Sequence, residues 1–465
     1  MYEVFTGMVK EEWRMHASLF GGRMFALFPF MLIGFAAMGT AFASILVEVI
    51  EPYNVAFIAH YSLLLFGVSV GAFGLLGREI MNRRFGQASL IAYSARSLPV
   101  SERHVMTAFY LKDVLYYMLL WILPVMAGIT VIAPLLSYGA VVPRLLVSLP
   151  LAFLVGLAVV FLLSTLYVHS SVLLAFVLAA GAALGILASQ QWEIRLAALL
   201  PPFSFFLHGS MLSLAASVAI IAVFSMLSLL FIRVEYPARE RRYAGTLSSL
   251  AHRLPVPHRW LVAKDFIDFT RSEGGIGKLV FGFGLPAAMV WLLFFVLAEF
   301  IPLLDFLPVF SLFLGIIASS IYNWLTEFDS FAGYAFLPVR VSTVMQGKVM
   351  SYLLLMVVPL GVLFGATVTS GQYDLLVPAV CAFFGMSFYA LSATVYLMGL
   401  HPTVLIYHAK LFALYTAMTA PVAVLLLFGA ALHPWLLCAA LLLLPFAWYI
   451  LRHAMQRWNR WTPTV

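Results

Sequence analysis

The strongest constraint on this chain is a series of apolar runs, each long enough to cross a lipid bilayer. One helical crossing takes about 20 mainly apolar residues, and windows of that length recur along all 465 residues. The sequence is 64% hydrophobic and only 10% charged. A soluble core does not account for that composition, so we expect a membrane protein.

These runs predict helices and not barrel strands. A barrel strand has about ten residues that alternate in character, whereas LLVSLPLAFLVGLAVVFLLSTL is apolar on every face. Backbone groups in lipid must be hydrogen-bonded within the protein, and a helix achieves this within one segment. We predict an all-α, polytopic membrane protein with about 12 transmembrane helices, over residues 24–50, 57–77, 108–134, 145–167, 170–188, 209–232, 279–300, 306–323, 347–369, 374–397, 408–430 and 433–451.

The distribution of basic residues predicts the orientation of these helices. Cytoplasmic loops of membrane proteins collect Lys and Arg. With the N-terminus inside, 24 of the 26 basic residues fall on the inner side, and only Arg144 and Arg195 fall outside. Both termini are therefore predicted to be cytoplasmic, and the protein is predicted to lie in the cell membrane as a multi-pass protein.

Charge and cysteine content narrow the class further. Charged residues precede the first apolar run, which is too long for a signal peptide, so no cleavable signal is expected. Cys381 and Cys438 both fall in predicted spans, which argues against a disulfide framework. The formal net charge of +7 fits attraction to anionic lipid. Membrane lipid is an expected partner, and nucleic acid is not, because no basic soluble domain is evident.

The chain divides into two tandem halves of six spans, separated by its longest polar stretch. We predict a first transmembrane half over residues 1–235, a cytoplasmic linker over 236–278 and a second half over 279–465. A charged, aromatic segment opens each half, VKEEWRMHASLFGGR in the first and AKDFIDFTRSEGGIGK in the second. This mixture suits a helix that lies in the membrane interface. The outer loop at 189–208 is predicted to hold a further short helix, either external or re-entrant.

A polar inner loop after the second span of each half carries residues in the same order. The loops run from Glu79 to Lys112 and from Glu327 to Lys348, and each contains glycine, Leu-Pro-Val and arginine. Proline fixes its own φ angle and disfavours the α region for the residue before it. Each Leu-Pro pair therefore forms a corner at the base of the third span. Parallel repeats of this kind are a known plan for transporters, and plain loop corners with positive inner charges are the alternative.

Motifs for chemistry on this chain are weak. GGIGK at 274–278 lacks two features of a phosphate-binding loop, because Ser272 and Leu279 stand where glycine and Ser or Thr belong. His401 and His408 could suggest metal or haem ligation, but no third ligand at a matching depth in the membrane accompanies them. We therefore expect no metal, no cofactor, no catalytic site and no ATP hydrolysis by this chain alone. Proton- and sodium-coupled carriers usually hold a charge at mid-membrane, and most spans here have none, so the energy source is expected elsewhere.

The interfacial helix of the type KEEWR and the loop with an acid, glycine, Leu-Pro-Val, Arg and Lys resemble the permease subunit of type 2 ATP-binding-cassette exporters. In that family a coupling helix in this loop docks on a separate ATPase, which the interfacial helix also touches. The usual subunit has six spans, so a chain with twelve is expected to be a fused pseudo-dimer that needs two ATPase copies.

The resemblance implies two sets of candidate residues. The coupling loops comprise Glu79, Arg83, Arg84, Arg96, Pro99, Arg103, Lys112, Glu327, Asp329, Pro338, Arg340 and Lys348, and the interfacial helices comprise Lys10, Glu12, Trp13, Arg14, Lys264, Asp265 and Arg271.

Three alternative classes stay open. A major-facilitator carrier also has twelve spans, but GREIMNRRFGQ lacks the Asp-Arg pair of its loop motif. A membrane enzyme needs acids or histidines clustered at one interface, and here they are scattered. A scaffold without transport is the third. The exported substrate is unknown, and a pathway without fixed charge suits hydrophobic or peptide cargo better than a small ion.

Overall fold

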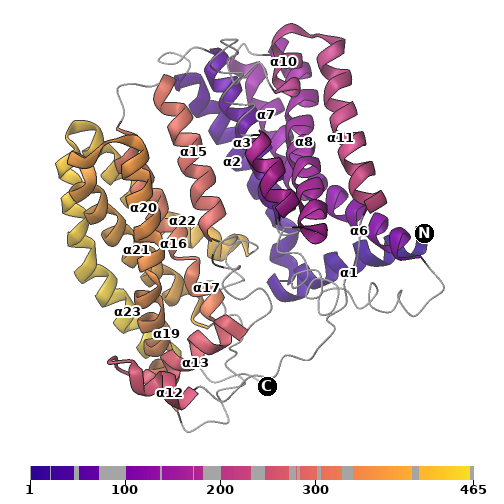
Figure 1. Ribbon diagram of the computed structural model, residues 1–465. Coiled ribbons are helices and arrows are strands. Elements are labelled where there is room, and N and C mark those ends of the chain that lie inside the picture. The colour runs from indigo at the N-terminus through magenta and orange to yellow at the C-terminus, as the bar shows by residue number, and fades with distance from the viewer. Residues whose placement is uncertain are drawn as a thin grey trace. The chain divides into compact units, whose positions relative to one another are not determined.

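The computed structural model describes residues 2–20, 22–46, 52–72, 101–136, 139–170, 172–181, 200–231, 247–271, 279, 283–300, 305–326, 339–400 and 408–460. Every regular element in these ranges is a helix (Figure 1). Up to residue 231 they are α1 (Tyr2–Phe20), η1 (Gly22–Leu27), α2 (Phe28–Leu46), α3 (Pro52–Ala72), α6 (Glu102–Tyr117), η2 (Met118–Ile122), α7 (Leu123–Ile132), η3 (Ala133–Leu136), η4 (Gly139–Val141), α8 (Val142–His169), α10 (Pro201–His208) and α11 (Met211–Phe231).

The helices of the later part follow in the same chain order. They are α12 (Leu247–Arg253), α13 (Arg259–Arg271), α15 (Leu285–Phe300), α16 (Phe306–Ala318), α17 (Ile321–Thr326), α19 (Val341–Leu355), α20 (Val357–Ser370), η7 (Tyr373–Leu375), α21 (Leu376–Met398), α22 (Ala409–Leu432), η9 (Pro434–Leu442) and α23 (Leu443–Asn459).

Within the described ranges, nine helices are long and apolar enough to cross a membrane. They cover Pro52–Gly71, Tyr110–Leu135, Gly139–Tyr167, Met211–Phe231, Phe306–Thr326, Val341–Ser370, Tyr373–Met398, Lys410–Leu432 and Pro434–Asn459. The prediction of an all-α, multi-pass membrane protein is confirmed at this level. The other three predicted spans correspond to α2, to a short apolar helix at Val172–Gly181 and to α15, none of which is among the nine. The number of twelve stays a prediction.

Several helices extend beyond the predicted ends of their spans. α6 begins at Glu102 and not at residue 108, α19 begins at Val341 and not at 347, and α23 continues to Asn459 and not to 451. Hydropathy marks where the apolar segment ends, whereas backbone hydrogen bonding continues through polar turns. The predicted short helix in 189–208 corresponds to α10, which packs on α3, α8 and α11.

The chain forms two compact units, one of Met1–Ser18 with Ala26–Arg239 and one of Leu19–Phe25 with Glu240–Val465. The boundaries of the predicted halves and linker stay predictions. In the first unit, α3 crosses α8 and α2 packs on α7. Glycines permit α3 and α8 to approach closely where they cross. A Cβ on Gly67 would lie 2.1 Å from the carbonyl oxygen of Phe153, and one on Gly156 would lie 2.2 Å from that of Leu64.

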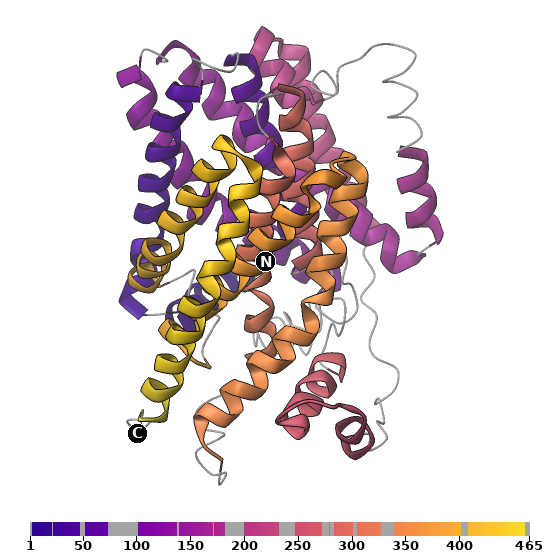
Figure 2. The same ribbon diagram turned by 90° about the vertical axis from the view of Figure 1, so that its left-hand side faces the viewer.

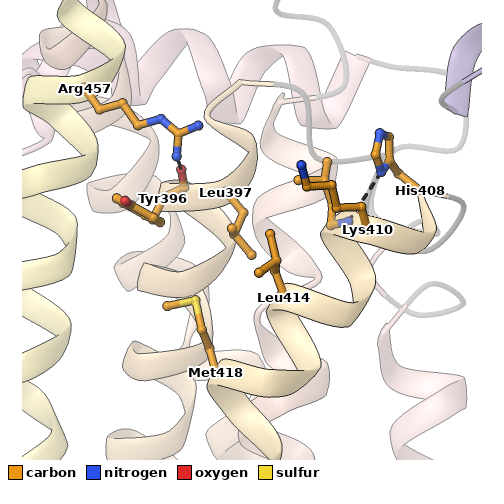
Figure 3. Close-up of a pocket in the computed structure, with 8 residues that line it drawn as sticks. Tyr396, Leu397, His408, Lys410, Leu414, Met418 and Arg457 are labelled. Atoms are coloured by element: carbon orange, nitrogen blue, oxygen red, sulfur yellow. Dashed lines mark hydrogen bonds between the residues drawn. The ribbon is translucent and has the colours of Figure 1, made fainter. Parts of the chain in front are cut away.

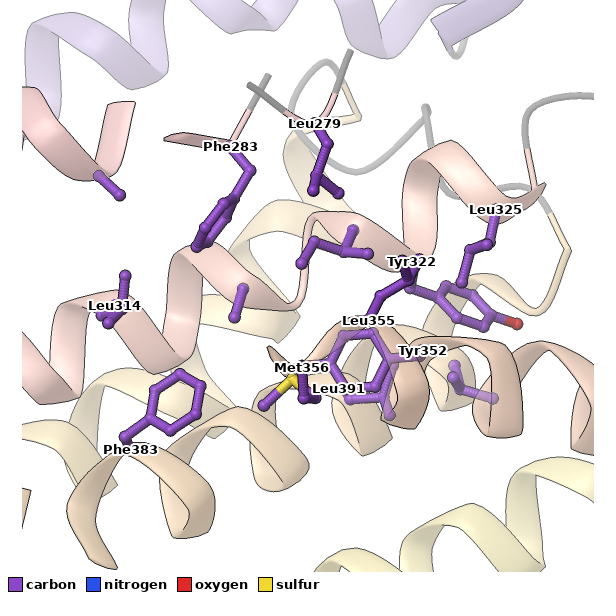
Figure 4. Packing of buried hydrophobic residues seen from close by; sticks show 14 of the residues in the cluster. Leu279, Phe283, Leu314, Tyr322, Leu325, Tyr352, Leu355, Met356, Phe383 and Leu391 are labelled. Carbon is purple, nitrogen blue, oxygen red and sulfur yellow. The ribbon is translucent and has the colours of Figure 1, made fainter. Parts of the chain in front are cut away.

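The core of the second unit lies where α16, α17, α19 and α21 converge. Figure 4 shows Leu314, Tyr322, Tyr352 and Phe383 in this cluster. Tyr352 and Ser387 join α19 to α21 through a hydrogen bond between their hydroxyls. α21 also packs along α23, and Figures 1 and 2 show the two side by side.

Helices α6 and α19, which are predicted to begin the third span of each half, share two features. Each starts three residues after the proline of a Leu-Pro-Val sequence, with Ser101 and Arg340 in extended conformation at the N-cap positions. Each is also interrupted after a similar length: α6 has 16 residues and passes into the π-helix η2, and α19 has 15 residues and ends at a turn at Met356. The described parts of these two spans are therefore built alike.

His60 is a buried polar residue inside the first unit, with no exposed surface. Its Nδ1 donates to the carbonyl oxygen of Ala56 (2.7 Å), so its Nε2 accepts from the hydroxyl of Ser148 on α8 (2.8 Å). The rings of Phe203 and Phe206 on α10 lie against it. His60 thus links α3, α8 and α10.

We expect His60→Leu to lower the free energy of unfolding by about 1–2 kcal/mol, because it removes an interhelical hydrogen bond and the ring contacts. Thermal unfolding of the purified protein in detergent measures this. Ser164→Ala on α8 is the control, since that hydroxyl donates only to Val160 of its own helix in the described contacts. Equal effects of the two substitutions would contradict a linking role for His60.

Candidate functional site

The candidate site lies where the short helix α13 meets helix α19 in the second unit. α13 has 13 residues, too few for a membrane crossing. Its buried face consists of Val262, Ala263, Asp265 and Phe269. These positions recur at helical spacing, so the carboxylate of Asp265 lies on the packed face among apolar side chains.

α19 presents Lys348 to this carboxylate about two turns from its start. Lys348 is 2% exposed, and the neighbouring Gly347 is also buried. A Cβ on Gly347 would lie 2.9 Å from Cβ of Leu261 on α13. The glycine therefore permits the two helices to approach closely beside the lysine.

An ion pair and two further hydrogen bonds join α13, α17 and α19 at this point. The ammonium of Lys348 contacts Oδ1 of Asp265 and donates to the carbonyl oxygen of Leu325 at 2.6 Å. The hydroxyl of Ser351 lies 2.7 Å from Oδ2 of Asp265 and donates to it. Both carboxylate oxygens are thus hydrogen-bonded.

Burial determines the electrostatics of this pair. Asp265 is 3% exposed, and removal from water penalises its charged form. Burial raises the pKa of the Asp265 carboxyl, while the charge of Lys348 and hydrogen bonds from Lys348 and Ser351 oppose that rise. Each charge therefore depends on its partner, and loss of either leaves an uncompensated charge in the interior.

A second ion pair on α13 lies at the surface. Lys264 and Asp268 are 2.9 Å apart, with side chains 36% and 38% exposed. Exposed pairs of this kind contribute about 0–1 kcal/mol. The same helix thus carries a buried pair that connects it to α19 and a solvated pair between two of its own residues.

The structure divides the sequence-predicted candidates into exposed and buried residues. Arg103 and Arg340 are exposed at the starts of α6 and α19. Lys112 is 4% exposed and lies 3.0 Å from Asp113. Exposed residues can contact a soluble partner directly, whereas Lys112, Lys348 and Asp265 are buried in the interior.

The remaining candidates fall on the interfacial helices or outside the described ranges. In α1, Lys10, Trp13 and Arg14 are exposed, and the side chain of Glu12 is not among those described. Arg271 lies in the last turn of α13. Glu79, Arg83, Arg84, Arg96, Pro99, Glu327, Asp329 and Pro338 lie outside the described residues.

Sequence reasoning did not identify Ser351, the carbonyl of Leu325, or the pairing of Asp265 with Lys348. Lysine within an apolar run was the available signal, because a buried cation needs a partner. The sequence alone does not identify Asp265 as that partner.

Comparisons with protein-family models, with curated proteins and with solved structures found no match for this chain. The class of the protein is described by its own fold and site. It is an all-α, multi-pass membrane protein in which a short amphipathic helix is joined to a membrane-spanning helix by a buried ion pair.

Proposed function

We propose that the chain is the membrane-spanning permease of an exporter that is driven by a separate ATP-binding-cassette ATPase. The observation that carries this proposal is the buried Asp265–Lys348 pair, which fixes α13 to α19. In the proposal the chain has twelve spans in two six-helix halves, both termini are cytoplasmic, and two ATPase copies bind to it in the cell membrane.

The pair gives α13 a mechanical role. In the proposed topology α13 lies at the inner membrane surface, where a soluble partner can contact it, and α19 leads into the membrane. Because the ion pair and the close packing at Gly347 join the two helices, a displacement of α13 also displaces α19. Packed helices move as units since interiors are close-packed.

The starts of α6 and α19 are the proposed contact points for the ATPase. Both carry an exposed arginine in this region: Arg103 lies two residues after the N-cap of α6, and Arg340 is the N-cap of α19. Arginine suits charged protein interfaces because its planar guanidinium forms paired hydrogen bonds with carboxylates. The proposal therefore assigns binding to exposed arginines and transmission to the buried pair.

Charge reversal tests the contact points. We expect Arg103→Glu combined with Arg96→Glu to reduce recovery of an ATP-binding-cassette ATPase with the affinity-tagged chain at least tenfold, because like charges then face each other. Immunoblotting and ATP hydrolysis in the purified fraction measure this.

Arg144→Glu is the matched control, since Arg144 is exposed at the start of α8 and is predicted to lie on the outer side. Its recovery of ATPase should equal that of the unmodified chain. Absence of any ATPase from the unmodified preparation, or undiminished recovery with the double reversal, would contradict the proposal.

A further inference from the structure

A cavity of about 670 Å³ lies between the ends of α21, α22 and α23 in the second unit. Figure 3 shows its polar side chains, Arg457, Tyr396, Lys410 and His408, above the apolar Leu414 and Met418. Among the described residues that line it, none carries a carboxylate. The cavity is therefore positive at one end and apolar at the other.

Arg457 is held in position at the rim. Its Nη1 donates to the carbonyl oxygen of Tyr396 at 3.2 Å, and its guanidinium lies 5.0 Å from the centre of the Tyr396 ring. A guanidinium has five N–H donors, so this bond leaves others for a ligand. Arg457 thus presents a fixed positive charge to the cavity.

His408 and Lys410 supply the opposite side of the rim. Nδ1 of His408 accepts from the backbone N–H of Leu411 at 3.3 Å and caps α22. In the neutral ring the proton is then on Nε2, which makes that nitrogen a donor. The exposed ammonium of Lys410 lies in the first turn of the same helix, where the helix dipole also favours an anion.

The depth of these groups agrees with a lipid headgroup. Lys410 opens the span Lys410–Leu432, and Arg457 lies near the end of the span Pro434–Asn459. Charged groups at the ends of spans lie at the level of the headgroups, whereas Leu414 and Met418 lie one to two turns further into α22. A ligand that fills the cavity therefore needs an anionic head and an apolar tail.

We propose that this cavity binds an anionic phospholipid, with its phosphate at Arg457, Lys410 and His408 and the start of an acyl chain against Leu414 and Met418. Basic pockets between transmembrane helices bind such headgroups by charge. The apolar lower wall distinguishes a phospholipid from free phosphate. This proposal does not depend on the proposed export function.

Binding of dioleoyl phosphatidylglycerol to the full-length chain in neutral detergent tests this, with native mass spectrometry as the readout. We expect Lys410→Gln and Arg457→Gln each to weaken binding about fivefold, and the double variant about thirtyfold, from the loss of one cation near a headgroup each time. Arg460→Gln is the matched control, because Arg460 is exposed on the same helix end but does not line the cavity. It should bind as the unmodified chain does.

Two further binding measurements distinguish a phospholipid from a free phosphate as the ligand. Inorganic phosphate and soluble glycerophosphoglycerol should bind at least a hundredfold more weakly than the phospholipid, since they lack the chain that contacts Leu414 and Met418. Unfolding temperatures without added lipid show that the variants are folded. Equal phosphatidylglycerol binding by the folded double variant, or free phosphate binding as tight as the lipid, overturns the proposal.

Discussion

Replacement of Lys348 by methionine is expected to lower the free energy of unfolding by about 3–5 kcal/mol, because the carboxylate of Asp265 then stays buried without a counter-charge. Asp265 and Lys348 are 3% and 2% exposed, so water does not replace the lost partner. Asp265→Asn should have an effect of similar size, since it leaves the ammonium uncompensated. Unfolding in detergent, followed by circular dichroism, measures both variants.

The double variant Asp265→Asn with Lys348→Met should be more stable than the sum of the single effects predicts. It removes both charges, and pairs in contact show coupling energies of about 0.5–3 kcal/mol. Asp268→Asn is the matched control on α13, because it breaks only the exposed pair with Lys264 and should change stability by about 0.5 kcal/mol or less. Two results would contradict a role for the ion pair in joining α13 to α19. One is a double-variant effect equal to the sum of the two single effects, and the other is single effects no larger than that of Asp268→Asn.

The same variants separate stability from the proposed function. In the double variant the exposed Arg103 and Arg340 are unchanged, so we expect the ATPase to bind normally. Transmission from α13 to α19 should be impaired, because the ion pair that joins them is lost. Loss of ATPase binding in a folded double variant would instead place Asp265 or Lys348 in the docking surface.

The second large effect is expected at the crossing of α3 and α8. Gly67→Ala should destabilise the first unit by about 3 kcal/mol, because the new Cβ would lie 2.1 Å from the carbonyl oxygen of Phe153. Backbone atoms inside a packed helix cannot move aside as a flexible side chain can, so the helices must separate. Gly156→Ala, whose Cβ would lie 2.2 Å from the carbonyl oxygen of Leu64, should act in the same way. Small residues at helix crossings permit this close approach in membranes.

Gly39→Ala in α2 is the control for the glycine variants. Its Cβ would meet nothing within 4 Å among the described residues, so the change should be neutral or stabilise the helix by up to about 1 kcal/mol. Unfolding in detergent under the same conditions compares the three variants. If Gly67→Ala is as mild as Gly39→Ala, the two helices do not pack as closely as described.

Properties that depend on neighbouring residues alone could be predicted from the sequence. Long apolar runs predicted helical, membrane-crossing segments, and the second and third spans lie close to their predicted positions as α3 and α6 to η3. Their ends were predicted less well, because α6 starts at Glu102, in a polar turn that hydropathy does not mark. The candidate list contained Asp265 and Lys348, but as members of separate surfaces.

What the sequence determined by itself is the class of the protein: lipid accepts only segments that satisfy their own backbone hydrogen bonds, and run length and composition report that locally. The tertiary structure decided which polar groups meet. Asp265 and Lys348 are 83 positions apart, and His60 and Ser148 are 88 apart. No spacing rule connects such positions, because their contact arises only when separate helices pack and exclude water from the groups between them.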